Sequence, residues 1–220
     1  MARLPRIIVP GVPHHVTQRG NRRQRVFMED DDYALYKDWL ARSCRSNGVE
    51  VWSYCLMPNH VHLILVPSDD TGLSRAVGET HRRYSGYINA RLRVTAHLFQ
   101  GRFGCVAMDE SHLMAAFRYV ALNPVKAKLA TTAVDWTWSS TPAHFRGNDD
   151  GLVTVQRVQP VARALLSHFF RKFIIRCIAW IQTLAFPFDS KTRKFVPCAA
   201  QFDATHTEHG MCAIQYPAHS

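Results

Sequence analysis

Residues 49–66 read VEVWSYCLM-PN-HVHLILV and decide the fold. Two runs rich in β-branched, aliphatic and aromatic residues, Val49–Met57 and Val61–Val66, flank Pro58-Asn59, a pair that is typical of a turn. The stretch therefore predicts a β-hairpin in which His60 directly follows the turn. The aliphatic second run indicates a strand that is buried in the core.

His60 and His62 alternate along that second strand, so their side chains are expected on the same face of the sheet. Two neutral imidazoles held side by side on a rigid strand supply half of a metal site. Such a pair leaves positions open for a substrate oxygen, which is the arrangement of a catalytic metal rather than a structural one. The alternative is two structural histidines whose ring nitrogens are satisfied by hydrogen bonds.

Outside the hairpin, hydrophobic periodicity and turn residues predict alternating strands and helices. The order β-α-β-β-α-β-α indicates an α+β fold, a split-βαβ, ferredoxin-like antiparallel sheet with flanking helices. In chain order, the predicted elements are a strand at His15–Gln18, a helix at Asp30–Ser46, the hairpin, a helix at Thr71–Leu92, a strand at Leu98–Met108, and a third helix that Asp109-Glu110-Ser111 caps and that runs to about Leu122, where Pro124 disturbs it.

The composition indicates an ordered protein with an anionic partner. The 220 residues can form one substantial domain with a small appendage, and 47% hydrophobic and 20% charged residues exclude a disordered chain. A net charge of +10 and an isoelectric point of about 9.6 favour nucleic acid as the partner. Arginine, whose planar fork suits phosphate, dominates two clusters. They are Arg3, Arg6, Arg19, Arg22, Arg23 and Arg25, and then Arg75, Arg82, Arg83, Arg91 and Arg93.

The cysteines and the apolar segments indicate in which cellular compartment the protein works. Six cysteines show no C-x-x-C pair and no regular spacing, which argues against a zinc finger or a disulfide framework. Residues 1–10 lack the apolar core of a signal peptide. The most apolar segment, Phe173–Phe186, contains Arg176 and is too short to cross a membrane. We therefore expect a reduced, cytoplasmic protein with no membrane partner.

Tyr119 and Asn123 lie one turn apart on the third predicted helix, outside its apolar arc. If that face meets the two histidines, Asn123 can complete a metal triad and Tyr119 can attack a bound phosphate. A phenol with a pKa of about 10 needs such help to act as a nucleophile. Mixed nitrogen and oxygen ligands suit Mn²⁺ and tolerate Mg²⁺, although Zn²⁺ also accepts imidazole. The alternative for Tyr119 is a packing tyrosine with a satisfied hydroxyl.

Tyr84 and Tyr87 are rival nucleophiles, but neither is followed one turn later by an amide that could bind the same metal. They are interpreted as packing or DNA-backbone contacts. His81, His97 and His112 are single histidines, and no function is assigned to them.

Five blocks of sequence carry a resemblance to a known family. The order and spacing of these blocks, over about residues 5–160, resemble those of the REP-associated tyrosine transposases. These are IS200-like, single-tyrosine members of the HUH endonuclease superfamily. The resemblance implies the HUH endonuclease fold, a ferredoxin-like or RRM-like sheet with flanking helices. The blocks are His14–Arg22 (HHVTQRGNR), Tyr54–Leu63 (YCLMPNHVHL), Phe99–Phe103 (FQGRF), Arg118–Val125 (RYVALNPV) and Trp136–Ser140 (WTWSS).

The resemblance also implies roles. His60 and His62 match the HUH pair, Asn123 the third ligand of a divalent metal (Mg²⁺ or Mn²⁺), and Tyr119 the catalytic tyrosine. Family members are bacterial proteins that cleave and rejoin single-stranded DNA near palindromic REP hairpins. We therefore expect a 5′-phosphotyrosine intermediate and a nucleoid-associated protein, either monomer or homodimer. The expected DNA contacts are His15, Arg19, Asn21, Arg22, Arg23, Gln100 and Arg102.

The C-terminal sequence departs from the family pattern from about Leu165. Residues 161–220 are therefore expected to form an atypical, partly disordered appendage to a transposase domain at 1–160. This departure leaves open a catalytically inactive hairpin-binding protein on the same fold. A replication-initiation or relaxase-type nickase would share the chemistry without these flanking blocks. A plain metallohydrolase would need a carboxylate beside the histidines as a base.

Overall fold

The computed structural model describes residues 6–155, 188–189 and 194–195. The chain divides into two compact units, Met1–Ile178 and Ala179–Ser220. The described part of the second unit is an antiparallel pair of short strands, β5 (Phe188–Asp189) and β6 (Lys194–Phe195). The expected domain boundary near residue 160 and the expected disorder of the appendage lie outside the described residues. Within those residues, no helix is both long and apolar enough to span a membrane.

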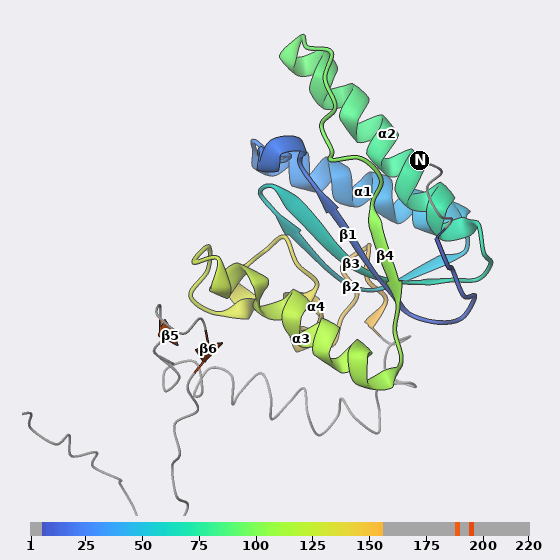
Figure 1. Cartoon of the computed structure of the whole chain (residues 1–220), viewed down its shortest axis with the longest axis vertical. Coiled ribbons are helices and arrows are strands. Elements are labelled where there is room, and N and C mark those ends of the chain that lie inside the picture. The colour runs from blue at the N-terminus through green and yellow to red at the C-terminus, as the bar shows by residue number, and fades with distance from the viewer. Residues whose placement is uncertain (1–5, 156–187, 190–193, 196–220) are drawn as a thin grey trace, which may run out of the picture. The chain divides into compact units, whose positions relative to one another are not determined.

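The first unit is built on a four-stranded antiparallel sheet with the strand order β2-β3-β1-β4 (Figure 1). This order places β3 between the two strands that the first helix connects, which is the split-βαβ arrangement. The predicted ferredoxin-like α+β fold is therefore confirmed. The strands are β1 (His14–Arg19), β2 (Val49–Met57), β3 (His60–Pro67) and β4 (Gly104–Ala107).

The hairpin predicted from residues 49–66 is present as β2 and β3. Met57 pairs with His60 across the two-residue turn, so the turn fixes the register at the histidines. On the other side of β3, Arg19 pairs with His60 and Thr17 with His62. Both histidines therefore lie on an inner strand, whose backbone is paired with β2 on one side and with β1 on the other.

Helices cover both faces of the sheet (Figure 1). Helices α1 (Asp30–Ser46) and α2 (Gly72–Leu92) pack on one face, and α3 (Glu110–Lys126) packs on the other. On the α3 face, Ile64 packs in one apolar cluster with residues of α3 that include Phe117 and Val120. The alternation of β3 therefore directs His60, His62 and Ile64 toward α3.

The predicted strand at Leu98–Met108 is wrong in its first half, because β4 begins only at Gly104. The backbone takes a left-handed turn at Gly101, with φ of 58°, which interrupts the ladder. Before that turn, Phe99 forms only an isolated bridge to Gly20. Gln100 and Arg102 therefore lie in a loop beside the end of β1 rather than on a strand.

Helix α3 continues past its predicted end at Leu122 to Lys126. Pro124 has no backbone N–H, so the helix loses one hydrogen bond to the carbonyl of Val120. The last turn still closes, because the Ala127 N–H donates to the Asn123 carbonyl over 3.0 Å. A proline this close to the C-terminus therefore does not end the helix.

The Trp136–Ser140 block lies along the outer edge of β2, between a short 3₁₀ helix, η2 (Ala133–Asp135), and α4 (Thr141–Arg146). The Leu56 N–H donates to the Trp138 carbonyl over 2.8 Å, and the Trp136 Nε1–H donates to the Leu56 carbonyl over 3.0 Å. This block therefore pairs with part of an edge that would otherwise expose unpaired backbone groups.

Candidate active site

His60 and His62 lie side by side on β3, with ring centroids 4.8 Å apart and ring planes at 87°. Burial, with a smaller contribution from the charge of Arg19, lowers the pKa of His60 to about 4. Burial likewise lowers the pKa of His62 to about 3, with smaller contributions from His60, His15 and Arg19. Both imidazoles are therefore neutral at pH 7, which is the form that binds a metal.

Each of these histidines has its Nδ1 occupied. The Nδ1 of His60 lies 2.6 Å from Asn59 Oδ1, so it carries the ring proton and leaves Nε2 as a lone pair. The Nδ1 of His62 lies 3.1 Å from His15 Nε2. The Nε2 of His62 is buried and has no hydrogen-bond partner among the described residues. A buried polar atom without a partner is costly, and a divalent cation would satisfy it.

His15 was expected to contact DNA, and the structure brings it into the histidine cluster. Its ring stacks on that of His62 with centroids 5.3 Å apart, and it meets the ring of Tyr119 at 6.2 Å. Burial lowers the pKa of His15 below its ordinary value. The sequence alone gave no sign of this contact, because it depends on the pairing of β1 with β3.

Tyr119 projects from α3 toward the same cluster. Its ring meets that of His62 edge-on, with centroids 5.1 Å apart, and its side chain is 43% exposed. The Nζ of Lys126, two turns later on the helix, lies 5.4 Å from the centre of the Tyr119 ring. Lys126 was not among the residues predicted from the sequence, although a residue seven positions after Tyr119 lies on the same face of a helix. The nucleophile candidate is therefore accessible to a substrate and lies beside a positive charge.

Asn123 differs from Tyr119 in its exposure. The helical arc predicted both outside the core, but Asn123 is buried. Its Nδ2 has no hydrogen-bond partner among the described residues. Rotation of the amide by 180° exchanges that atom for the oxygen, a suitable ligand. The described residues hold no group of three His, Cys, Asp or Glu side chains suited to a metal. An amide oxygen as the third ligand fits the donors that are present.

The predicted DNA-contact loop forms a short 3₁₀ helix, η1 (Asn21–Arg23), beside the hairpin turn. The Asn59 Nδ2 donates to the Arg23 carbonyl over 3.3 Å, which joins this loop to the turn before His60. Arg22 and Arg23 have exposed side chains on a left-handed backbone, with φ of 50° and 62°. Together with Arg19, the loop brings exposed positive charge to the rim of the histidine cluster.

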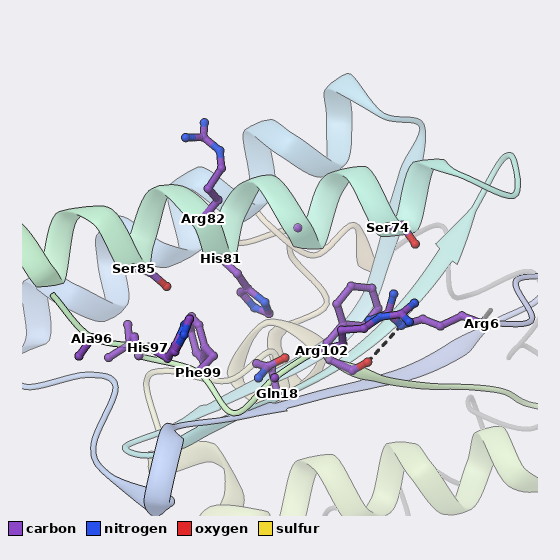
Figure 2. Close-up of a pocket in the computed structure, with 14 residues that line it drawn as sticks. Arg6, Gln18, Ser74, His81, Arg82, Ser85, Ala96, His97, Phe99 and Arg102 are labelled. Carbon is purple, nitrogen blue, oxygen red and sulfur yellow. Dashed lines mark hydrogen bonds between the residues drawn. The ribbon is translucent and has the colours of Figure 1, made fainter. Parts of the chain in front are cut away.

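Arg102 lines a cavity of about 440 Å³ between α2 and the loop before β4 (Figure 2). Arg6 enters the same cavity. Its Nε donates to the Phe103 carbonyl over 3.1 Å, and its guanidinium lies 3.7 Å from the centre of the Phe103 ring. Burial and the charge of Arg102 lower the pKa of Arg6. No acidic side chain lines the cavity within the described residues, so it is suited to an anion.

The second arginine cluster is partly engaged within the protein. Arg91 forms two hydrogen bonds with the carboxylate of Asp32, at 2.7 and 2.8 Å, and Arg82 forms two with that of Glu79. Arg83 lies 4.8 Å above the ring of Trp39. These three arginines stabilise the packing and the surface of α2, so much of the cluster that was expected to bind phosphate has a structural role.

The rival tyrosines are held in structural contacts. Tyr84 is fully buried, and its hydroxyl donates to the Val26 carbonyl over 2.7 Å. Tyr87 meets the ring of Trp39 edge-on at 6.0 Å. Neither forms a ring contact with His15, His60 or His62, whereas Tyr119 contacts His15 and His62.

The candidate site lies within a region that matches the model of a known family. The model of the family described as "Transposase IS200 like" matches residues 9–123, about half of the chain. The chain belongs to this family of IS200-like transposases. The matched range extends from β1 to Asn123 and contains His60, His62 and Tyr119.

One solved structure supports the fold. A REP-associated tyrosine transposase bound to a REP hairpin is similar at a TM-score of 0.57 and 20% identity, over 70% of this chain and 92% of that one. A protein from Deinococcus radiodurans R1 described as a transposase is 22% identical, over 54% of this chain and 95% of its own. Its TM-score of 0.39 is too low to establish a shared fold. No curated protein matches this transposase chain.

Proposed function

We propose that this transposase cleaves and rejoins single-stranded DNA through a covalent bond to Tyr119, at a site that binds Mg²⁺ or Mn²⁺ through His60, His62 and Asn123. The observation that carries the proposal is the edge-on contact of Tyr119 with His62, at 5.1 Å between centroids, beside the unpartnered Nε2 of His62. The ring of the nucleophile candidate thus lies against the side chain of a candidate metal ligand.

The reaction is a transesterification. The Tyr119 hydroxyl loses its proton and attacks a backbone phosphorus, so that a Tyr O–P bond forms. The P–O3′ bond breaks, and the released 3′ oxygen takes up a proton. The products are a 5′-phosphotyrosine and a free 3′-hydroxyl, and attack by another 3′-hydroxyl reverses the steps to complete strand transfer.

A bound divalent ion supplies Lewis-acid stabilisation of the charge that develops on the phosphate. The protein residues fix the geometry around it. Asn59 orients His60 through its Nδ1, and the central position of β3 keeps His60 and His62 in place. The packing of α3 against Ile64 holds Tyr119 over the cluster.

The proposed substrate is a palindromic hairpin with a single-stranded flank, by analogy with the REP-associated transposase whose structure contains a REP hairpin. We infer that Arg19 and the loop Asn21–Arg23 contact phosphates near the cut, because they carry exposed positive charge beside His60. Gln100 and the cavity around Arg102 are placed beside the end of β1, where the Gln100 N–H donates to the Arg19 carbonyl over 2.8 Å. Such a protein would work on the bacterial nucleoid in the cytoplasm.

An adduct assay tests the proposal. A labelled hairpin oligonucleotide with a single-stranded tail is incubated with the full chain and Mn²⁺ or Mg²⁺, and the SDS-stable protein–DNA adduct is quantified. We expect an adduct with the natural chain, and none with Tyr119→Phe, which should still bind the oligonucleotide. Tyr87→Phe, which removes another partly exposed hydroxyl, is the matched control and should react normally. Binding without any adduct in the natural chain would instead support the inactive hairpin-binding alternative.

A further inference from the structure

His15 and His62 share a hydrogen bond, and the structure constrains which of the two histidines donates it. The His62 Nδ1 and the His15 Nε2 are 3.1 Å apart, so one of them carries the shared proton. A neutral imidazole holds one ring proton, on either Nδ1 or Nε2. The partner that donates across this contact therefore decides which nitrogen of His62 is left as a lone pair.

We propose that His15 is a positioning residue, which accepts a hydrogen bond from His62 and thereby holds His62 with its proton on Nδ1 and its Nε2 lone pair free for the metal. This inference rests on the proposed function, because it assigns a role to His15 at the same site. It replaces the expectation that His15 contacts DNA.

The surroundings of His62 favour this direction. If His15 were the donor, the proton of His62 would sit on Nε2, as a buried N–H with no acceptor among the described residues. His60 shows the same pattern independently, since its Nδ1 donates to Asn59 Oδ1 and its Nε2 therefore carries the lone pair. Both proposed ligands thus have Nδ1 held by a neighbour, which is how protein metal sites orient histidine ligands.

The position of His15 on the sheet allows it to hold the ring of His62 in one orientation. It lies on β1, a central strand paired with β3 and β4, and it is diagonal to His62, because Thr17 is the residue directly opposite. Its ring stacks on that of His62 at 26° between planes, so the His62 ring cannot rotate without displacing it.

The neighbouring histidine serves as an internal contrast. His14, on the opposite face of β1, is fully buried, with its Nδ1 2.7 Å from the Val12 carbonyl and its Nε2 accepting from the Val9 N–H. Both nitrogens of His14 are thus used within the protein. The histidine cluster differs because the nitrogen left without a partner, Nε2 of His62, is the one proposed to bind the metal.

Two measurements test the inference without any catalytic readout. In the metal-free natural chain, ¹⁵N-edited NMR of the histidine rings reports the tautomer, and we expect the proton of His62 on Nδ1. In titration calorimetry with Mn²⁺ alone, His15→Leu should bind about 10–100-fold more weakly than the natural chain. His15→Gln, whose amide oxygen can accept the same hydrogen bond, should recover most of the affinity. His97→Leu, which removes an exposed histidine, is the control and should bind normally.

The outcomes separate this inference from the proposed function. A His62 proton on Nε2, or Mn²⁺ affinity of His15→Leu within twofold of the natural chain, would overturn the role of His15, while a normal adduct would leave the proposed function intact. Absence of Mn²⁺ binding and of adduct in the natural chain would overturn both. The tautomer measurement decides the matter even if His15→Leu fails to fold.

Discussion

The ring of Tyr119 meets the ring of His62 edge-on, with centroids 5.1 Å apart and planes at 89°. The two residues come from distant parts of the chain, and ordinary core packing brings them together. Phe117 and Val120 on α3 pack with Ile64, which is two residues after His62 on the same face of β3. The position of the nucleophile candidate is therefore set by the hydrophobic contact between α3 and the sheet.

Replacement of His60 by alanine tests the metal ligands. Because His60 is only partly buried, His60→Ala should leave the thermal unfolding temperature nearly unchanged, while Mn²⁺ affinity and adduct yield fall by about 100-fold or more. Calorimetric titration with Mn²⁺ and the adduct assay measure the two effects, and EDTA should abolish the adduct in the natural chain. Full adduct formation in EDTA would count against a metal site.

The loop beside the hairpin turn is expected to bind phosphates. The double substitution Arg22→Ala/Arg23→Ala should reduce the dependence of log affinity on log salt by about 0.7–0.9 for each phosphate contact that is lost. Fluorescence anisotropy of a tailed hairpin at several salt concentrations measures this slope. Arg42→Ala, which removes an arginine paired with Asp38 on α1, should leave the slope unchanged. Equal slopes for the natural chain and the double variant would remove these arginines from the DNA interface.

Acid should destabilise the protein through buried neutral histidines. Burial lowers the pKa of His81 to about 3, against an ordinary value of about 6.5, so between these values the unfolded chain binds a proton that the folded chain does not. The free energy of unfolding therefore falls as the pH drops below about 6.5, by about 1.4 kcal/mol per pH unit for this group. His60 and His62 shift in the same direction.

Urea unfolding at pH 7 and pH 5 measures this effect. His81→Gln removes the titration and can keep the hydrogen bond to the Tyr36 hydroxyl, which lies 2.8 Å from His81 Nε2. From pH 7 to pH 5, the free energy of unfolding should fall by about 2 kcal/mol less in the variant than in the natural chain. The same loss in both proteins would show that His81 does not remain neutral in the fold.

The ion pair between Arg91 and Asp32 is expected to stabilise the packing of α2 against the start of α1. The Asp32 side chain is fully buried, so Arg91→Met would leave a buried carboxylate with only its backbone donors, those of Met28 and Glu29. We expect a loss of about 3 kcal/mol in the free energy of unfolding. Arg42→Met, which breaks the exposed pair with Asp38, should cost about 0.5 kcal/mol or less. Similar small losses for both variants would contradict the role given to Arg91.

The local pattern of hydrophobic and turn residues was enough to predict most of the helices and strands that carry the candidate site. The β-branched and aliphatic runs around Pro58-Asn59 predicted the hairpin, and the hydrophobic periodicity of residues 30–46 predicted α1 with its observed bounds. The strand expected at 98–108 was wrong because its β-like residues are interrupted by one glycine with positive φ, which composition does not reveal. The helix end at Lys126 was missed because Pro124 was assumed to stop the helix rather than to occupy its last turn.

The chemistry of the site was less accessible to sequence. The spacing of His60, His62, Tyr119 and Asn123 indicated a metal and a nucleophile, but the partner of His62 depends on a diagonal contact between strands. Part of the second arginine cluster is used within the protein, which the sequence did not reveal, since pairs such as Arg91 with Asp32 form only when distant helices meet. Such relations arise from tertiary packing, and periodicity along the chain cannot supply them.

The most direct test of the account is to identify the amino acid that becomes linked to DNA. The adduct formed with a tailed hairpin in Mn²⁺ is digested with protease and nuclease, and the modified peptide is sequenced by mass spectrometry. We expect a nucleotide attached through a 5′ phosphate to the oxygen of Tyr119. A linkage at any other residue, such as Tyr87, would contradict it.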